Sequence, residues 1–349
     1  MTGVINALLA AALFGASTPF AKMMLGQVPP VMMAGLLYLG SGLGLLAWFA
    51  LRAMNAKGKG GGFAPLTVPD LPWFAGAILA GGVAGPLLLM TGLILVPAST
   101  ASLLLNLEGA LTALLAWIVF KENLDRRIFA GMGLIVTAGL LLAWQERPEF
   151  GVPWGALAIV GACLCWAIDN NLTRKVSAGD AVQIAGIKGL VAGMVNLAIA
   201  LFLGAAWPAW ANVVLAGLIG FLGYGASLAM FVVALRHLGA ARTGAYFSAA
   251  PFVGVVVALL LFHEAPGSLF WLASGMMAAG IWLHLTERHE HAHAHPAMRH
   301  IHSHVHDEHH SHRHDFPWDG KEPHTHEHEH EPITHWHAHF PDIHHRHGH

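Results

Sequence analysis

Ten stretches of about 20 mostly apolar residues fill the first 286 positions of this chain, and each is long enough to cross a bilayer as an α-helix. They lie near residues 3–24, 31–52, 71–94, 99–119, 126–144, 154–174, 181–204, 211–235, 241–262 and 268–286. Lys, Arg, Asp and Glu make up only 11% of the chain, against about 25% in soluble domains. A water-soluble globular protein is therefore excluded, and an all-α membrane protein with ten transmembrane helices is expected.

The basic side chains of the loops gather on one side of the expected membrane. Eleven fall on the side that holds both chain ends, whereas only Lys22 and Arg147 fall on the other. The eleven are Arg52, Lys57, Lys59, Lys121, Arg126, Arg127, Arg174, Lys175, Arg236, Arg242 and Arg288. Because cytoplasmic loops carry the excess of Lys and Arg, the N-terminus and the C-terminus are predicted to be cytoplasmic. Short loops between helical spans suit a bacterial inner membrane, which is the expected location.

The chain also repeats itself weakly in two places. Residues 14–22 align with 166–174 at an offset of 152, and residues 98–122 align with 240–264 at an offset of 142. Each half holds five expected spans, an odd number, so the second half must cross the membrane upside down relative to the first. Such inverted repeats are typical of secondary transporters, which bind substrate near the midplane between the halves. The expected domains are two five-helix repeats, 1–146 and 147–286, and a tail, 287–349.

Two motifs of these repeats carry a resemblance to a known family. One is the first-helix motif centred on Phe14 in the first half and on Trp166 in the second; the other is the glutamate that ends a long apolar helix, Glu122 and Glu264. With these features, residues 3–286 resemble the ten-span, EamA-type members of the drug/metabolite transporter superfamily. The resemblance implies secondary transport, usually export of small polar metabolites, without ATP. In agreement, the chain has no Walker-type loop ending in Lys-Ser or Lys-Thr.

Other function classes find no support in the sequence. No nucleophile and base pair or phosphate-binding loop is present, so an enzyme is not expected. The formal net charge of −2 and the lack of a nucleic-acid motif exclude nucleic acid as a partner. Cys163 and Cys165 are spaced so that their side chains diverge on a helix, and no disulfide is expected. No cofactor is required; the expected partners are the lipid bilayer and a small cationic or metabolite substrate.

One carboxylate lies deep in an expected span. Glu108 is about nine residues inside the span 99–119, or roughly 13 Å at 1.5 Å per residue, which places it near the membrane midplane. A carboxylate there costs at least about 2.5–3.5 kcal/mol, so it usually faces a cavity or a partner. With Asn106 it is expected to line a pathway for a cation or a proton. The alternative is a protonated acid hydrogen-bonded within the bundle, and the matching residue of the second half, Ala250, cannot replace it.

A second acid, Asp169, has a basic neighbour at a similar depth. Asp169 in the sixth span and Lys188 in the seventh are equally distant from the turn at 177–179, so an antiparallel hairpin brings them together. A buried ion pair is one interpretation, and contact with the substrate is the other. One of the next two residues, Asn170 or Asn171, is expected to face the cavity in either case.

Two aromatic residues, Phe14 and Trp166, occupy matching places in the two halves. They are expected to form facing walls of a central cavity. The alternative for Trp166 is an anchor at the interface with water, a common place for Trp in membrane proteins. One departure from the family concerns Pro251, a frequent proline position, where the first half has Gly109 preceded by Glu108.

The end of the chain is rich in histidine. All but three of the 26 histidines lie after residue 286, where they alternate with small or acidic residues. With few aliphatic residues this segment cannot bury a core, so a disordered, His-rich cytoplasmic tail is predicted. Imidazole is a good ligand for zinc, copper and nickel, and the expected ligands are His289, His291, His293, His295, His300, His302, His304, His306, His324, His326, His328 and His330. The alternatives are a pH-sensing tail and a neutral low-complexity extension.

These features together predict an inner-membrane secondary transporter that exports a divalent transition metal, nickel or cobalt before zinc, in exchange for protons. The layout of an EamA-type domain with a His-rich cytoplasmic end resembles members of the superfamily associated with nickel and cobalt resistance. The main alternative is an amino-acid or small-metabolite exporter whose tail regulates transport or stores metal, because the membrane core has few strong metal ligands. A membrane-anchored metal sensor or store without transport is the third possibility.

Overall fold

The computed structural model describes residues 2–55, 70–120, 126–145, 152–175, 181–231, 233–234, 246–286, 290–295, 298–304, 324–330 and 333–338. The chain forms two compact units, which are described separately. The first comprises Met1–Gly58 and Phe63–Glu287, and the second comprises Lys59–Gly62 and Arg288–His349.

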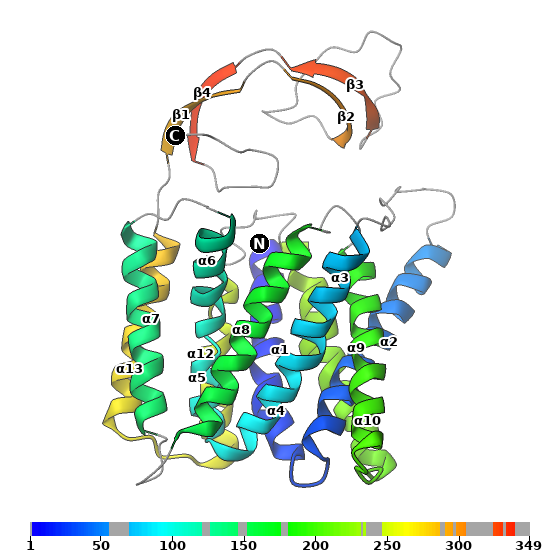
Figure 1. The fold of residues 1–349 in the computed structure, drawn as a ribbon, viewed down its shortest axis with the longest axis vertical. Helices are drawn as coiled ribbons and strands as arrows, with labels where there is room; N and C mark the ends of the chain where they lie inside the picture. Colours follow the sequence, from blue (N-terminus) through cyan, green and yellow to red (C-terminus); the bar gives the residue numbers. More distant parts are fainter. Residues whose placement is uncertain are drawn as a thin grey trace. The chain divides into compact units, whose positions relative to one another are not determined.

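The first unit is a bundle of helices that lie side by side (Figure 1). In chain order they are α1 (Thr2–Met24), α2 (Pro30–Asn55), α3 (Leu71–Ala77), α4 (Gly85–Leu95), α5 (Ala98–Leu104), α6 (Leu107–Phe120), α7 (Arg126–Gln145), α8 (Trp154–Lys175), α9 (Ala181–Phe202), α10 (Trp210–Gly220), α12 (Ala250–Phe262) and α13 (Ser268–Leu285). Two segments are π-helical, η2 (Ile78–Ala84) and η3 (Phe221–Ala226). The predicted all-helical membrane domain is confirmed for the described residues of this unit.

Eight of the described helical segments are long and apolar enough to cross a membrane. They match the first eight expected spans, from Gly3–Met24 to Trp210–Phe231. The last two expected spans correspond to shorter apolar helices, Ala250–Phe262 and Ser268–Leu283. Because the expected start of the ninth span, at 241–245, lies outside the described residues, the count of ten stays a prediction.

Helices α2 and α9 form the most extensive helix pair of the bundle. Gly35 lies against Leu197 and Gly42 against Leu190, so the two helices run in opposite directions. A Cβ atom added at either glycine would overlap the backbone of α9. Since helices in lipid are held together by close van der Waals packing, these glycines set how closely α2 and α9 approach.

The π-helical segment η2 connects three helices through its carbonyl groups. Gly81 O accepts hydrogen bonds from the Tyr38 hydroxyl of α2 at 2.8 Å and from Trp166 Nε1 of α8 at 2.9 Å. The next carbonyl, Gly82 O, accepts a bond from Asn196 Nδ2 of α9 at 2.8 Å. π-Helical turns are frequent at functional sites, and Gly81 of this one lies against the Asp169 carboxylate.

The described part of the second unit consists of four strands, β1 (Glu290–His295), β2 (Met298–His304), β3 (His324–His330) and β4 (Ile333–Ala338). β1 pairs with β4 and β2 with β3, both antiparallel. Histidines face histidines in the register: His300 is paired with His328, and His302 with His326. The prediction of a disordered tail is therefore wrong for these segments, because alternation at period two also fits a paired strand. His289 and His306, two of the predicted metal ligands, lie outside the described residues.

Candidate functional site

Glu108 lies at a break in the fourth span. The sequence predicts one helix over 99–119, whereas the structure has α5 and α6 separated by a turn at 105–106. Glu108 N bonds to Leu105 O at 3.1 Å, and the carboxylate is in the first turn of α6. The helix dipole favours a negative charge at this position. Discontinuous helices of this kind commonly form the substrate and ion sites of secondary transporters.

Helix α8 supplies the partner of Glu108. Asn170 Nδ2 donates to Glu108 Oε1 at 2.9 Å and lies 3.4 Å from Thr112 Oγ1. The buried Asn171 amide instead donates to Ala167 O at 2.8 Å and to Thr112 O at 3.3 Å. The structure thus joins residues of the two predicted halves directly. Asn170 is exposed, whereas Asn171 is buried.

Asn106 is not brought into this pair. Its side chain is buried, and its amide donates to Leu103 O at 3.0 Å and to Met277 Sδ at 3.6 Å. Asn106 belongs to the turn and Glu108 to the helix that follows, so their side chains leave the backbone in different directions. Asn106 therefore stabilises the turn between α5 and α6 and is not hydrogen-bonded to Glu108 or its partner Asn170.

Asp169 forms the ion pair that its spacing predicts. Lys188 Nζ of α9 contacts Asp169 Oδ2, and Thr173 Oγ1 donates to Asp169 Oδ1 at 2.9 Å. The Lys188 and Asp169 side chains are 17% and 7% exposed. Of the two alternatives for Asp169, the structure supports the ion pair. Asp169 directly precedes Asn170 in α8, so the ion pair and the Glu108 contact involve neighbouring residues.

The two matching aromatic residues each pack against a π-helical segment. The Phe14 ring lies 5.8 Å from that of Tyr224 in η3 and 5.5 Å from that of Phe247, measured between centroids. Trp166 is 7% exposed in the middle of α8 and donates to Gly81 O of η2. This buried position does not fit an interfacial anchor for Trp166, and the shared cavity stays a prediction.

Sequence reasoning missed Thr112, Tyr38 and Tyr224. Thr112 follows Glu108 by one helical turn, and this spacing was a usable signal. Tyr38 and Tyr224 are two of only three tyrosines in the chain, and their ring centroids lie 5.6 Å apart. Nothing in a single sequence shows that α2 and η3 meet, so this contact was not predictable.

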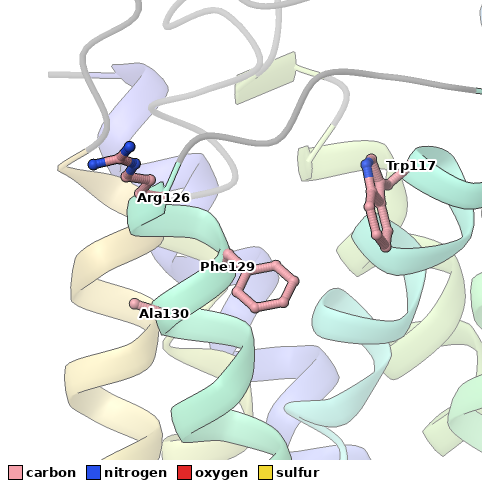
Figure 2. A pocket seen from close by; sticks show the side chains of 4 residues that line it. All are labelled: Trp117, Arg126, Phe129 and Ala130. Atoms are coloured by element: carbon pink, nitrogen blue, oxygen red, sulfur yellow. The ribbon is translucent and has the colours of Figure 1, made fainter.

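A separate cavity of about 300 Å³ opens between α6 and α7, and it is lined by Trp117, Arg126, Phe129 and Ala130 (Figure 2). Figure 2 shows the Phe129 ring on α7 and the Trp117 ring on α6 on either side of the gap, with the Arg126 guanidinium pointing away from both. The two ring centroids are 6.5 Å apart. Trp117 lies more than two helical turns beyond Glu108, and none of the four residues is a predicted site residue.

Strong metal ligands are sparse around Glu108. Within the part of the chain that the structure describes, no three His, Cys, Asp or Glu side chains form a group that could hold a metal ion. The partners of Glu108 and Asp169 are an amide, hydroxyls and an ammonium. A donor set of this kind would hold a divalent metal ion only weakly.

Glu264 lies on the opposite side of the bundle from the expected cytoplasmic loops. Its carboxylate accepts bonds from Ala98 N at 2.8 Å and Ser99 N at 3.0 Å, the first amides of α5. The chain reaches this position because His263 has φ 52°, a left-handed conformation that ends α12. The sequence pattern identifies this residue as the end of a long apolar helix; the structure shows that Glu264 also caps another helix.

Replacing Glu264 by alanine is expected to destabilise the protein by about 1–2 kcal/mol, because two amides of α5 lose their acceptor. Thermal unfolding of the purified protein in detergent measures the loss. Glu264→Gln is the control, since its amide oxygen retains an acceptor and should recover part of the stability. An unchanged unfolding temperature for Glu264→Ala would show that the cap contributes nothing.

Comparison with known proteins agrees with the helical membrane bundle. The chain matches the EamA-like transporter family over residues 1–144 and 153–286. It is 29% identical over 297 residues to an uncharacterized transporter of Methanothermobacter thermautotrophicus, covering 80% of this chain and 85% of that protein. It is 24% identical over 265 residues to the uncharacterized inner membrane transporter YedA of Escherichia coli K12, covering 72% and 80%.

One solved crystal structure shares the fold with a TM-score of 0.59 at 18% identity, covering 80% of this chain and 96% of the other. The family match includes both predicted halves and nearly all the described helices, and transport rather than catalysis is the activity that its description names. With the membrane helices and the broken fourth span, these matches lead to one conclusion: the chain belongs to the EamA-like transporter family.

Proposed function

We propose that this chain is a secondary transporter that exports a divalent transition metal ion, Ni²⁺ or Co²⁺ before Zn²⁺, in exchange for protons. The observation that carries the proposal is the Glu108 carboxylate, held at the break between α5 and α6 and bonded by Asn170 at 2.9 Å. A carboxylate inside a membrane is costly, and this one is held where the two predicted halves meet. The Glu108 carboxylate would bind the metal ion in one half of the cycle and a proton in the other.

The location and the tail add to the proposal. The excess of Lys and Arg in one set of loops favours cytoplasmic chain ends in a bacterial inner membrane. The His-rich tail would then capture metal ions on the side from which they are exported. Its cross-strand histidine pairs, such as His302 with His326, support this role, because directly opposite residues of an antiparallel pair have Cβ atoms about 4.5–5.5 Å apart.

A second candidate is export of an amino acid or small metabolite, with a tail that regulates transport or stores metal. It is favoured by the cluster of aromatic rings that Phe14, Tyr38 and Tyr224 form between α1, α2 and η3 and by the sparse metal ligands of the described residues. An organic cation has apolar surface for such rings to contact, whereas a hydrated metal ion has none.

Transport by purified protein in proteoliposomes decides between the candidates. With a pH gradient imposed, the full chain is expected to move Ni²⁺, Co²⁺ and Zn²⁺. A 1–286 truncation is expected to retain transport at saturating metal but to need about 3- to 10-fold more metal for half-maximal rate, because the tail no longer concentrates the ion. Metal bound to the full chain without flux in either form, together with flux of labelled amino acids, would replace the first candidate by the second.

A further inference from the structure

The buried ion pair between Lys188 and Asp169 lies next to the proposed cation site. Asp169 directly precedes Asn170, which donates to Glu108. Asp169 is 5% exposed overall, and its two oxygens are taken by Lys188 and Thr173. Two adjacent residues of α8 therefore take part in the two carboxylate interactions: Asp169 pairs with Lys188, and Asn170 donates to Glu108.

Packing alone does not require this charge. A Cβ atom added at Gly81 of η2 would overlap the Asp169 carboxylate, so Asp169 fills a space left by a glycine. The same kind of contact occurs at Ser17, which fills the space left by Gly223 of η3. Ser17 and Asp169 are 152 residues apart, the offset of the first-helix repeat. A small uncharged residue thus makes the equivalent contact, and burying a charged pair is seldom a gain in stability.

Several further polar groups lie around the pair. They are Glu108 of α6, Tyr38 of α2 and Trp166 of α8, with Tyr224 of η3 beyond Tyr38. Within the described part of the chain, Lys188 supplies the positive charge that contacts Asp169. Without its ammonium, Asp169 would be a buried carboxylate with no positive charge beside it.

We propose that Lys188 is an internal cation that occupies Asp169 while the transporter is empty, and that the transported cation displaces it. The inference rests on the proposed function, because only a cationic substrate competes with an ammonium for a carboxylate. The metal-free transporter, with the exchanged proton on Glu108, must change orientation to begin a new cycle, and an uncompensated Asp169 carboxylate inside the membrane opposes this step. The Lys188 ammonium neutralises the Asp169 carboxylate during this step and leaves it when the transported cation binds.

The test separates net transport from exchange. In proteoliposomes, Lys188→Gln is expected to slow net Ni²⁺ efflux about 10-fold or more, because the empty site carries an uncompensated charge during its return. Exchange of radioactive Ni²⁺ for unlabelled Ni²⁺, which never passes through the empty state, is expected to stay within about 2-fold of the unsubstituted protein. Lys188→Arg keeps the charge and is expected to retain both rates. Lys22→Gln, at a lysine that donates to Val96 O instead, is the matched control.

A stability measurement keeps the inference testable apart from transport. Lys188→Gln is expected to unfold at a lower temperature without metal, and Ni²⁺ is expected to restore the loss, since the ion replaces the missing ammonium. A variant that Ni²⁺ does not restore, or that loses exchange and net efflux equally, would overturn the inference while leaving metal export in place. Failure of the unsubstituted protein to move Ni²⁺, Co²⁺ or Zn²⁺ would instead remove the proposed function and this inference together.

Discussion

Glu108→Gln is expected to reduce Ni²⁺ export driven by a pH gradient by about 10- to 100-fold, the effect of losing one charge-assisted interaction of about 1.5–3 kcal/mol. Glutamine preserves the size of the side chain and can still accept the bond from Asn170 Nδ2, which the structure gives as 2.9 Å for glutamate. It can neither carry a negative charge nor exchange a proton. The initial rate of Ni²⁺ uptake into inverted vesicles, with and without the gradient, measures the loss.

The control for this prediction is Glu264→Gln, a change of the same chemistry at a carboxylate that caps α5. It is expected to export at nearly the normal rate once the protein is folded. Full export and full metal resistance with Glu108→Gln would contradict the proposal that Glu108 binds the transported cation or the exchanged proton. Glu108 would then be the protonated structural acid that the sequence analysis gives as the alternative, held in the bundle by Asn170.

The spans were predictable because a 20-residue apolar stretch is a strong and local signal. The breaks within them were not. The turn at 105–106 interrupts a stretch whose average hydropathy is high throughout, and a second turn at 248–249 interrupts the ninth expected span. Two polar residues in twenty barely change such an average. The break nevertheless decides where Glu108 lies, at the start of a helix rather than in its middle.

Contacts between helices were predictable only where chain geometry fixes them. Asp169 and Lys188 lie at equal distances from one turn, so their pairing follows from the hairpin alone. The contact of Tyr38 with η2 depends on how α2 is rotated about its axis, which the nearly uniform apolarity of α2 does not reveal. Asn106 shows the reverse error, since closeness in sequence to Glu108 did not place the two side chains together.

Two features of the structure recur at the spacing of the repeat seen in the sequence. A shift of 142 residues, taken from the sequence, places the turn at 105–106 on 247–248, one residue from the turn at 248–249 that breaks the fourth span of the second half. The same shift places Gly81 on Gly223, one in each π-helical segment. Features that no hydropathy pattern specifies therefore recur at the spacing of the repeat, which is expected if both halves fold alike.

The tail shows a different limit of sequence reasoning. Few aliphatic residues mean that no core is buried, and disorder was predicted for that reason. The strands β1 to β4 need no buried core of this kind, since backbone pairing gives them their register. The alternation of histidine at period two indicated strands, but the prediction of disorder was based on the low content of aliphatic residues instead.

The second large effect is expected from Gly42→Ala, which should lower the unfolding temperature by about 5–10 °C, the result of 1–3 kcal/mol of overpacking. A Cβ atom there would lie 2.7 Å from Gly189 C and 2.8 Å from Leu190 Cα, both backbone atoms of α9. Backbone cannot turn aside as a side chain does, so α2 and α9 must separate. Tryptophan fluorescence during heating of the detergent-solubilised protein measures the change.

Gly133→Ala is the matched control, because it lies within α7 and nothing is found within 4 Å of a Cβ atom added there. Alanine is the better helix former by about 1 kcal/mol, so this variant should unfold at the same temperature or slightly higher. Intrinsic helix propensity thus acts in the same direction at both sites, and the difference between the variants isolates the crossing of α2 and α9. Equal unfolding temperatures would mean that the two helices tolerate separation, and that glycine at position 42 is not what fixes their distance.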